Sequence, residues 1–324
     1  MHFLKATGLV AILALGPLSA SAQEAEWTPR RNIEFIVPYS AGGGSDLNAR
    51  ALSEAIRKNR LIPRNMMILN RPGGSGAVGN SYVASRTAEP HTLMTFNSGQ
   101  MMSMLTNNAQ VRLDNITPLG TLALDTLVFV VRADSPYESF ADLAEAARAA
   151  PQTLTVGGSG RGGEDNLVFA LANQPAEGAL QYVPFEGGGD ALAAVLGGHV
   201  TVGIFNPSEI SAQIEGGSVK GLGIFSEQRL EGAFAEVPTF VEQGHPDAVF
   251  EMFRGYAGPP DLPPEAIAYW NGVLSQVSQS DEWKEDIERN SLIPAYMDAE
   301  ESAAFWKREE ARYLELLTDL GFIQ

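Results

Sequence analysis

The chain has 324 residues and no cysteine, and its 22 Lys and Arg against 39 Asp and Glu give a formal net charge of −17. Such acidity argues against a nucleic-acid partner or a role on anionic lipid, because either requires a broad basic face. The lack of cysteine excludes disulfides, Cys-ligated zinc, iron–sulfur clusters and a thiol nucleophile. With 44% hydrophobic and 19% charged residues, the chain has the composition of one large or two ordinary globular domains.

The first 22 residues have the pattern of an export signal. Lys5 precedes an apolar run at 9–15, and the small residues Ala20, Ser21 and Ala22 follow. The run is too short to span a bilayer, which takes about 20 apolar residues. We therefore expect a secreted chain cleaved after Ala22, and in a Gram-negative cell that location is the periplasm.

From residue 33 on, the chain repeats a β-rich run, a glycine-rich turn and a helical pattern. A strand is predicted at 33–37, and a helix at 47–56 has the spacing of one buried face. Further strands are predicted at 66–69 and 91–96. Strands that alternate with helices predict βαβ units and a mostly parallel sheet.

The rhythm is interrupted by a long β-rich stretch without a helix at 117–132, after which a second α/β series begins. Another extended segment, at 249–257, precedes a helical tail. The second series and the tail comprise a helix at 140–147, a strand at 153–156, a glycine loop and helix at 157–171, strands at 180–183, 200–205 and 219–225, and helices at 267–277 and 305–320. Two extended segments that bracket an α/β unit predict two α/β lobes joined by two crossing strands. Lobe I would comprise 23–122 plus 250–324, and lobe II would comprise 123–249.

Four glycine-rich loops follow predicted strands, at 40–46, 70–79, 157–163 and 184–190. In an open α/β sheet, ligands bind at the carboxyl ends of the strands, and helix N-termini there offer N–H donors and partial positive charge. Arg71, Arg161 and Arg254 lie near the same ends. With two loops in each lobe, the sequence predicts an anion site in a cleft between the lobes. Ser45 and Asp46 either contribute to that site or cap the helix after Gly44.

Enzyme motifs are weak. G-x-G-x-x-G occurs at Gly74, Gly76 and Gly79, without the acidic residue that a dinucleotide site requires, and again at Gly158, Gly160 and Gly163, where Glu186 lies near the required place. An exported dinucleotide-binding oxidoreductase therefore stays open as the alternative. The sequence contains no P-loop, G-x-S-x-G or HExxH motif. We expect no enzyme, no cofactor and no metal site.

Six segments in order resemble one family: IEFIVPYSAGGGSDLNARAL, NRPGGSGAVGNSYVA, VGGSGRGGEDNL, YVPFEGGGDALAAVLGGHV, VPTFVEQG and FRGYAGPPDLP. They are similar to the extracytoplasmic solute-binding proteins of tripartite tricarboxylate transporters, the Bug family. The resemblance implies a periplasmic binding protein fold of type II and no catalysis. It also implies a small carboxylate ligand, citrate-like or a dicarboxylate, held between the lobes of a monomer. The implied partners are a large and a small membrane subunit, although presentation of the ligand to a membrane sensor is also compatible.

The resemblance also implies the ligand contacts. Where the citrate-type branch of the family has Asp-His, this chain has Asp165-Asn166, so an amide replaces a group that could be cationic. Arg161 is the expected charge-assisted contact. The expected contacts of lobe I are Tyr39, Ser40, Gly43, Gly44, Asp46, Gly74, Ser75, Asn97 and Ser98. Those of lobe II and the second crossing segment are Ser159, Arg161, Gly163, Asn166, Phe185, Asn206, Pro207 and Arg254.

Overall fold

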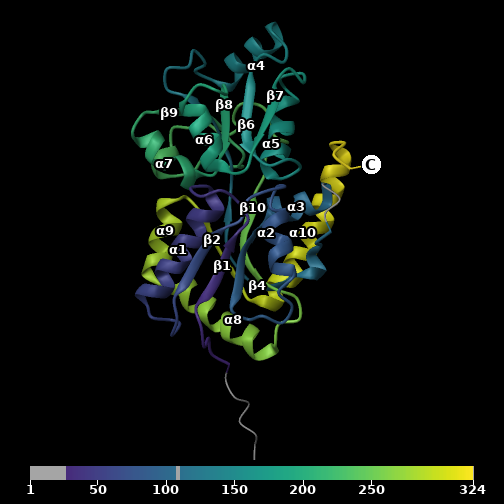
Figure 1. The fold of residues 1–324 in the computed structure, drawn as a ribbon. Helices are drawn as coiled ribbons and strands as arrows, with labels where there is room; N and C mark the ends of the chain where they lie inside the picture. Colours follow the sequence, from purple (N-terminus) through teal and green to yellow (C-terminus); the bar gives the residue numbers. More distant parts are fainter. Residues whose placement is uncertain (1–26, 107–109, 324) are drawn as a thin grey trace, which may run out of the picture.

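The computed structural model describes residues 27–106 and 110–323, which form two α/β lobes stacked one above the other (Figure 1). Each lobe contains one sheet with helices packed against it, so the predicted fold class is confirmed. The export signal expected at 1–22 and its cleavage after Ala22 lie outside the described residues.

Lobe I, the lower lobe in Figure 1, contains a six-stranded sheet in the order β11-β4-β10-β3-β1-β2. Its strands are β1 (Ile33–Val37), β2 (Met66–Asn70), β3 (Thr92–Asn97), β4 (Thr117–Asp125), β10 (Met252–Gly258) and β11 (Ile293–Met297). Its helices are α1 (Gly44–Lys58), α2 (Ala77–Ala84), α3 (Ser98–Thr106), α8 (Pro264–Gln279), α9 (Asp281–Arg289) and α10 (Ala299–Asp319).

Lobe II contains a five-stranded sheet in the order β7-β6-β8-β5-β9. Its strands are β5 (Val128–Arg132), β6 (Thr155–Ser159), β7 (Gln181–Phe185), β8 (Val202–Phe205) and β9 (Val219–Ile224). Its helices are α4 (Phe140–Ala149), α5 (Glu164–Asn173), α6 (Gly188–Leu196) and α7 (Pro207–Glu215).

The chain crosses between the lobes twice. β4 pairs within the lobe I sheet up to Asp125, and β5 begins in the lobe II sheet at Val128. The chain leaves the lobe II sheet at Ile224, the end of β9, and re-enters the lobe I sheet at Met252, the start of β10. The lobe boundaries at 122/123 and 249/250 stay a prediction, and the strand pairing favours a first crossing at 126–127.

Both sheets are mixed, which corrects the prediction of a mostly parallel sheet. β1 is parallel to β2 and β3, and β6 is parallel to β7 and β8. β10, however, is antiparallel to β3 and β4, and β5 is antiparallel to β8 and β9. The crossing segments explain the difference, because a strand that arrives from the other lobe enters its sheet in the opposite direction.

The first of the two glycine loops of lobe II, predicted at 157–163, begins later in the structure. Gly157 and Gly158 continue β6, which ends at Ser159, and α5 begins only at Glu164. A Cβ on Gly157 would lie 3.0 Å from Cε2 of Phe185 on the neighbouring strand β7. Gly157 is therefore a strand residue that leaves room for the Phe185 ring, and the loop itself comprises only residues 160–163.

The C-terminal helix α10 fixes β10 in lobe I, and Figure 1 shows it along one side of that lobe. Trp306 of α10 is fully buried and stacks on Phe253 of β10, with ring centroids 5.4 Å apart. Its Nε1 donates to Oγ1 of Thr121 on β4 at 3.0 Å. A Cβ on Gly255 would lie 2.5 Å from the Trp306 ring, so the glycine permits this close packing. The contact holds both strands that carry the crossings, and with them the position of Arg254.

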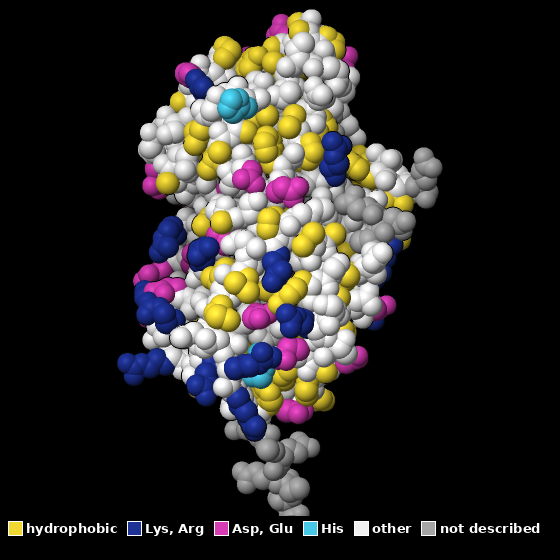
Figure 2. All heavy atoms as spheres, viewed as in Figure 1, with side chains coloured by type: hydrophobic (Ala, Val, Ile, Leu, Met, Phe, Trp, Pro, Cys, Tyr) yellow, Lys and Arg dark blue, Asp and Glu magenta, His cyan; other side chains and the backbone are white. Residues whose placement is uncertain are grey.

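The charge of the protein is divided unequally between the lobes. Residues 123–249 contain 5 Lys and Arg against 17 Asp and Glu, whereas 27–122 and 250–324 together contain 16 against 20. On the face shown in Figure 2, most Lys and Arg side chains lie over lobe I. Lobe II is therefore the strongly acidic half of the molecule.

Candidate functional site

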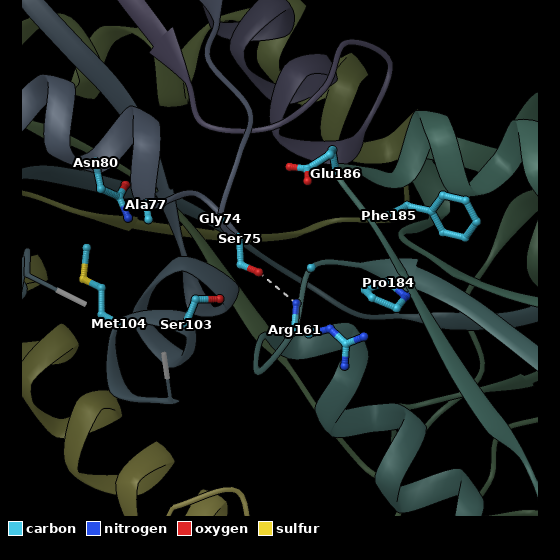
Figure 3. Close-up of a pocket in the computed structure, with 11 residues that line it drawn as sticks. Gly74, Ser75, Ala77, Asn80, Ser103, Met104, Arg161, Pro184, Phe185 and Glu186 are labelled. Carbon is cyan, nitrogen blue, oxygen red and sulfur yellow. Dashed lines mark hydrogen bonds between the residues drawn. The ribbon is translucent and has the colours of Figure 1, made fainter. Parts of the chain in front are cut away.

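The four glycine loops meet in pairs where the lobes face each other. Ser40 in the first loop donates through Oγ to Oδ2 of Asp190 in the fourth loop at 2.6 Å. The backbone N–H of Arg161 in the third loop donates to Oγ of Ser75 in the second at 2.8 Å, the dashed line in Figure 3. The predicted arrangement of two loops from each lobe is thus present, and the lobes are in direct contact.

Two cavities lie along this seam. We call the smaller one, of about 20 Å³, the inner cavity, and it has room for about one water molecule. The larger one, the outer pocket of Figure 3, has a volume of about 460 Å³, in the range of small-molecule sites. The inner cavity is lined by Tyr39, Gly43, Gly44, Ser45, Asn97, Ser159, Glu164, Gly188, Asn206, Glu209 and Arg254. The outer pocket is lined by Gly74, Ser75, Ala77, Asn80, Ser103, Met104, Gly160, Arg161, Pro184, Phe185 and Glu186.

The expected contacts divide between these cavities. Seven line the inner cavity: Tyr39, Gly43, Gly44, Asn97, Ser159, Asn206 and Arg254. Four line the outer pocket: Gly74, Ser75, Arg161 and Phe185. That each of these residues contacts a ligand stays a prediction.

Arg254 reaches the inner cavity from β10 with its charge already paired. It is 3% exposed, and its Nε donates to Oδ2 of Asp125 on β4 at 2.9 Å. A Cβ on Gly44 would lie 2.6 Å from Nη2 of Arg254 and 2.6 Å from Oδ1 of Asn206. Because Gly44 has no side chain, the guanidinium of Arg254 and the side-chain amide of Asn206 in lobe II can both approach the backbone at the N-terminus of α1.

Two carboxylates that the sequence analysis did not single out also line the inner cavity. Glu209 of α7 accepts from the backbone N–H of Gly44 through Oε1 at 2.6 Å and from that of Asn206 through Oε2 at 2.8 Å. Glu164, the first residue of α5, is 9% exposed and lies against Gly99 of α3, where an added Cβ would overlap its carboxylate. A sequence signal exists for Glu209, because Asn206 and Glu209 have the spacing of a capping box.

Burial and neighbouring carboxylates disfavour the ionised form of these carboxyls. Burial, and next the charge of Asp165, raise the pKa of Glu164 to about 8. The same two causes raise the pKa of Glu209 to about 7. Burial raises the pKa of Asp165 to about 6, although it accepts from the backbone N–H and Oγ of Ser159 at 2.5 and 2.9 Å. Lobe II thus brings three acidic groups to the site.

Asp46 lies in the first turn of helix α1 and lines neither cavity. It accepts from the backbone N–H of Gly42, from Arg50 and from Nδ2 of Asn70, at 2.9, 2.8 and 3.0 Å. Burial would raise its pKa, but these bonds outweigh burial and lower the pKa of Asp46 below its usual range. The N-cap residue of α1 is Gly43, which receives no side-chain cap bond, so Asp46 instead ties the first turn of the helix to Gly42 and to Asn70 of β2. A ligand contact by Asp46 stays a prediction.

The remaining expected contacts hold the loops and elements in place. Oγ of Ser98 lies 2.7 Å from the hydroxyl of Tyr313 and accepts from the N–H of Phe253 at 2.9 Å, which ties α3 to α10 and β10. Oδ1 of Asn166 accepts from the N–H of Gly162 at 3.0 Å. Three others are Gly163, which precedes α5, Pro207, which begins α7, and Ser40, described above.

Across residues 27–106 and 110–323, no three His, Asp or Glu side chains are grouped so that they could hold a metal ion. In the same ranges, no helix combines the length and the apolar character needed to cross a membrane.

The model of a family described as "Tripartite tricarboxylate transporter family receptor" matches residues 48–322. Protein BugT of Bordetella pertussis is 24% identical over 306 residues, 93% of either chain. The solved periplasmic binding protein BugD has a TM-score of 0.85 at 20% identity, covering 91% of this chain and 99% of that one. MatC from Rhodopseudomonas palustris with bound malate has a TM-score of 0.82 at 22% identity, covering 89% and 99%.

These comparisons remove one of the alternatives left by the sequence. At 20 to 22% identity the two solved structures establish the fold. The family consists of receptors that bind solutes, which removes the dinucleotide-dependent oxidoreductase and confirms that the chain is not an enzyme. Because the family match spans most of its length, this protein belongs to the tripartite tricarboxylate transporter receptor family and is a solute-binding protein of the TctC/Bug type.

Proposed function

We propose that this protein captures a small carboxylate between its lobes in the periplasm and presents it to the membrane subunits of a tripartite transporter. One observation carries the choice of a carboxylate: the N-terminus of α1 already holds one, because Gly44 N–H donates to the Glu209 carboxylate at 2.6 Å. Helix N-termini favour anions through unpaired N–H groups and the helix dipole. The malate on MatC supports the same ligand class.

Ligand capture would proceed by closure of the lobes. The bonds from Ser40 to Asp190 and from Arg161 to Ser75 join opposite lobes, so they exist only when the lobes are together. A ligand that bonds both walls adds contacts available only in that arrangement and shifts the population toward it. The closed protein is then the form that the membrane subunits would recognise.

The test is a thermal-unfolding panel on residues 23–324, refolded from denaturant to remove ligand acquired during expression. The panel includes malate, succinate, citrate, adipate, aspartate, glutamate, phosphate and NAD⁺. A ligand at 100 times its dissociation constant adds about 2.7 kcal/mol of stability, which raises the unfolding temperature by several degrees. Stabilisation by no carboxylate, or by NAD⁺ alone, would overturn the proposal.

A pair of glycine variants tests the position of the site. In Gly44→Ala the added methyl meets Arg254 and Asn206, so the stabilisation by ligand should disappear. Gly272→Ala on α8 is the control, because nothing lies within 4 Å of its added Cβ. If Gly44→Ala still responds to ligand as the control does, the carboxylate binds elsewhere.

A further inference from the structure

The two walls of the inner cavity have opposite hydrogen-bonding character. Lobe I and β10 offer donors, namely the N–H of Gly44 at the start of α1 and the guanidinium of Arg254. Lobe II offers acceptors, the carboxylates of Glu164 and Glu209. In the structure the two walls are hydrogen-bonded to each other directly, because the carboxylate of Glu209 accepts from the Gly44 N–H. Because the inner cavity has room for about one water molecule, a ligand enters it only when the walls move apart, and it then replaces that bond and has to serve both walls.

In the part of the chain that the structure describes, the acceptor wall lacks positive charge to balance its carboxylates. Among the described residues lining the inner cavity, only Arg254 is cationic, and Asp125 already pairs with it. Glu164, Glu209 and the adjacent Asp165 therefore leave an excess of up to three negative charges when all are ionised. Around them lobe II is acidic as a whole, with 5 Lys and Arg against 17 Asp and Glu in residues 123–249.

A plain dicarboxylate fits only half of this arrangement. One carboxylate would accept from the donor wall, but the second would face Glu164 and Glu209, and like charges in a buried site repel. A ligand that carries a carboxylate and a protonated nitrogen fits both walls. Its carboxylate takes the donors of lobe I, and its N–H groups donate to the carboxylates of lobe II as charge-assisted hydrogen bonds.

Building on the proposed function, we propose that Glu164 and Glu209 are specificity-determining residues that select a carboxylate bearing a positively charged nitrogen over plain di- and tricarboxylates.

The proposal fixes the sign of the pH dependence. The ionisable groups that interact electrostatically with Glu164 or Glu209 are Tyr39, Asp165, Tyr182 and Arg254, and Asp125 is the ion-pair partner of Arg254. Burial raises the pKa of both tyrosines further, so they stay neutral, and the three carboxyls of lobe II carry the response between pH 6 and 8. A cation beside them lowers their raised pKa values, so binding releases protons and tightens as the pH rises. A plain dicarboxylate would take up protons and bind more tightly as the pH falls.

The experiment is titration calorimetry at pH 6 and pH 8 with two matched pairs, succinate with aspartate and glutarate with glutamate. Members of a pair differ by one ammonium group. We expect the ammonium-bearing member to bind at least about tenfold more tightly at pH 8, the scale of one charge-assisted hydrogen bond, with a smaller ratio at pH 6. Measurement in buffers of different ionisation enthalpy reports the released protons.

The variants Glu164→Gln and Glu209→Gln keep the size of the side chain and remove its charge, although one acceptor oxygen becomes an N–H donor, so Glu209→Gln can keep only one of the bonds from Gly44 and Asn206. Each should reduce the preference for the ammonium-bearing member several-fold, and either one suffices if the other does not fold. Glu215→Gln is the matched control, because Glu215 is exposed at the far end of α7, the helix that carries Glu209. It should leave the preference unchanged.

Three outcomes would overturn the selection while leaving a carboxylate receptor intact. They are tighter binding of the plain dicarboxylates, proton uptake on binding, and an unchanged preference in both Gln variants. Should no pair bind, the ligand found by the thermal panel decides, and a carboxylate without a protonated nitrogen counts against the selection. A panel without any carboxylate ligand would overturn the proposed function itself.

Discussion

The two lobes use the same local sequence pattern to build opposite walls. In both, a strand runs through glycines into the first turn of a helix, so both could present bare N–H donors. Lobe I offers the N–H of Gly44, which bonds a carboxylate of the other lobe, while Asp46 in the first turn of α1 is bonded within lobe I. Lobe II instead brings two first-turn carboxylates to the inner cavity, Glu164 of α5 after a glycine loop and Glu209 of α7 after Asn206 and Pro207. The partners of the first-turn carboxylates therefore decide whether a helix N-terminus offers donors or acceptors to the cavity, and glycine spacing by itself does not.

The largest effect is expected at the buried charge pair of lobe I, between Arg254 of β10 and Asp125 of β4. In Arg254→Met, the 1%-exposed carboxylate of Asp125 loses its partner on the crossing strand β10. Breaking a buried pair on one side typically costs about 3 to 5 kcal/mol, because an uncompensated charge stays buried. Urea unfolding at pH 7.5 should register that loss of stability.

A surface ion pair gives the matched control. Arg229 and Glu242 form a pair in lobe II with side chains 41% and 44% exposed, so Arg229→Met should cost no more than about 1 kcal/mol. Adding Asp125→Leu to Arg254→Met removes the orphaned charge and should recover part of the loss. Equal stability of Arg254→Met and Arg229→Met would contradict the structural role of the buried pair.

A smaller loss is expected at Asp46, whose bonds hold the first turn of α1 against the preceding loop and β2. Asp46→Ala removes the bonds to Gly42 N–H, Arg50 and Asn70, and hydrogen bonds to a charged group are worth about 1.5 to 3 kcal/mol. The pKa of Asp46 is lowered in the folded protein, so its contribution is present above the unfolded value near 3.8 and is lost as the pH falls through the folded value. The difference in urea midpoint between wild type and variant should therefore shrink on acidification from pH 6 to pH 3. A constant difference across that range would show that the carboxylate charge is not what stabilises the first turn of α1.

The sequence predicted the overall arrangement because the relevant signals are local. The strand at 33–37 coincides with β1, and the helix-free stretch at 117–132 contains β4 and β5. The glycine loops and the family motifs predicted a site between two lobes, and two cavities lined by residues of both lobes lie there. Seven of the expected contacts line the inner cavity and four line the outer pocket.

What the sequence could not supply depends on contacts between residues far apart in the chain. Arg254 was expected to reach a ligand, but its pairing with Asp125, 129 positions away, is a result of strand order. In the sequence Glu209 looks like an ordinary capping residue, and only the packing of the two lobes places its Oε1 within 2.6 Å of the Gly44 nitrogen. Asp46 and Ser98 resemble ligand contacts because they occur in the right loops, yet their side chains are used within lobe I.

The smallest effect on ligand affinity is expected at two hydrogen bonds between the lobes, from Ser40 to Asp190 and from Arg161 to Ser75, which we call the rim contacts. Ser40→Ala removes the bond to Asp190, and Ser75→Ala removes the acceptor for Arg161 N–H. Each bond joins opposite lobes, so its loss weakens closure rather than the fold of either lobe. At about 0.5 to 1.5 kcal/mol per hydrogen bond, ligand affinity should fall by roughly 2- to 12-fold while the unliganded unfolding midpoint stays near that of wild type.

A serine hydroxyl that is bonded within a single helix provides the control for an effect on ligand affinity that leaves the fold intact. Ser278 donates through Oγ to the carbonyl of Ser275 within α8 at 2.8 Å, so Ser278→Ala should leave ligand affinity unchanged. Calorimetry on the three variants compares the two rim contacts directly. Since Ser40 donates to a carboxylate and Ser75 accepts from an amide, the larger loss is expected for Ser40→Ala. A larger loss for Ser75→Ala would mean that the outer pocket, more than the inner cavity, determines how tightly the lobes close on the ligand.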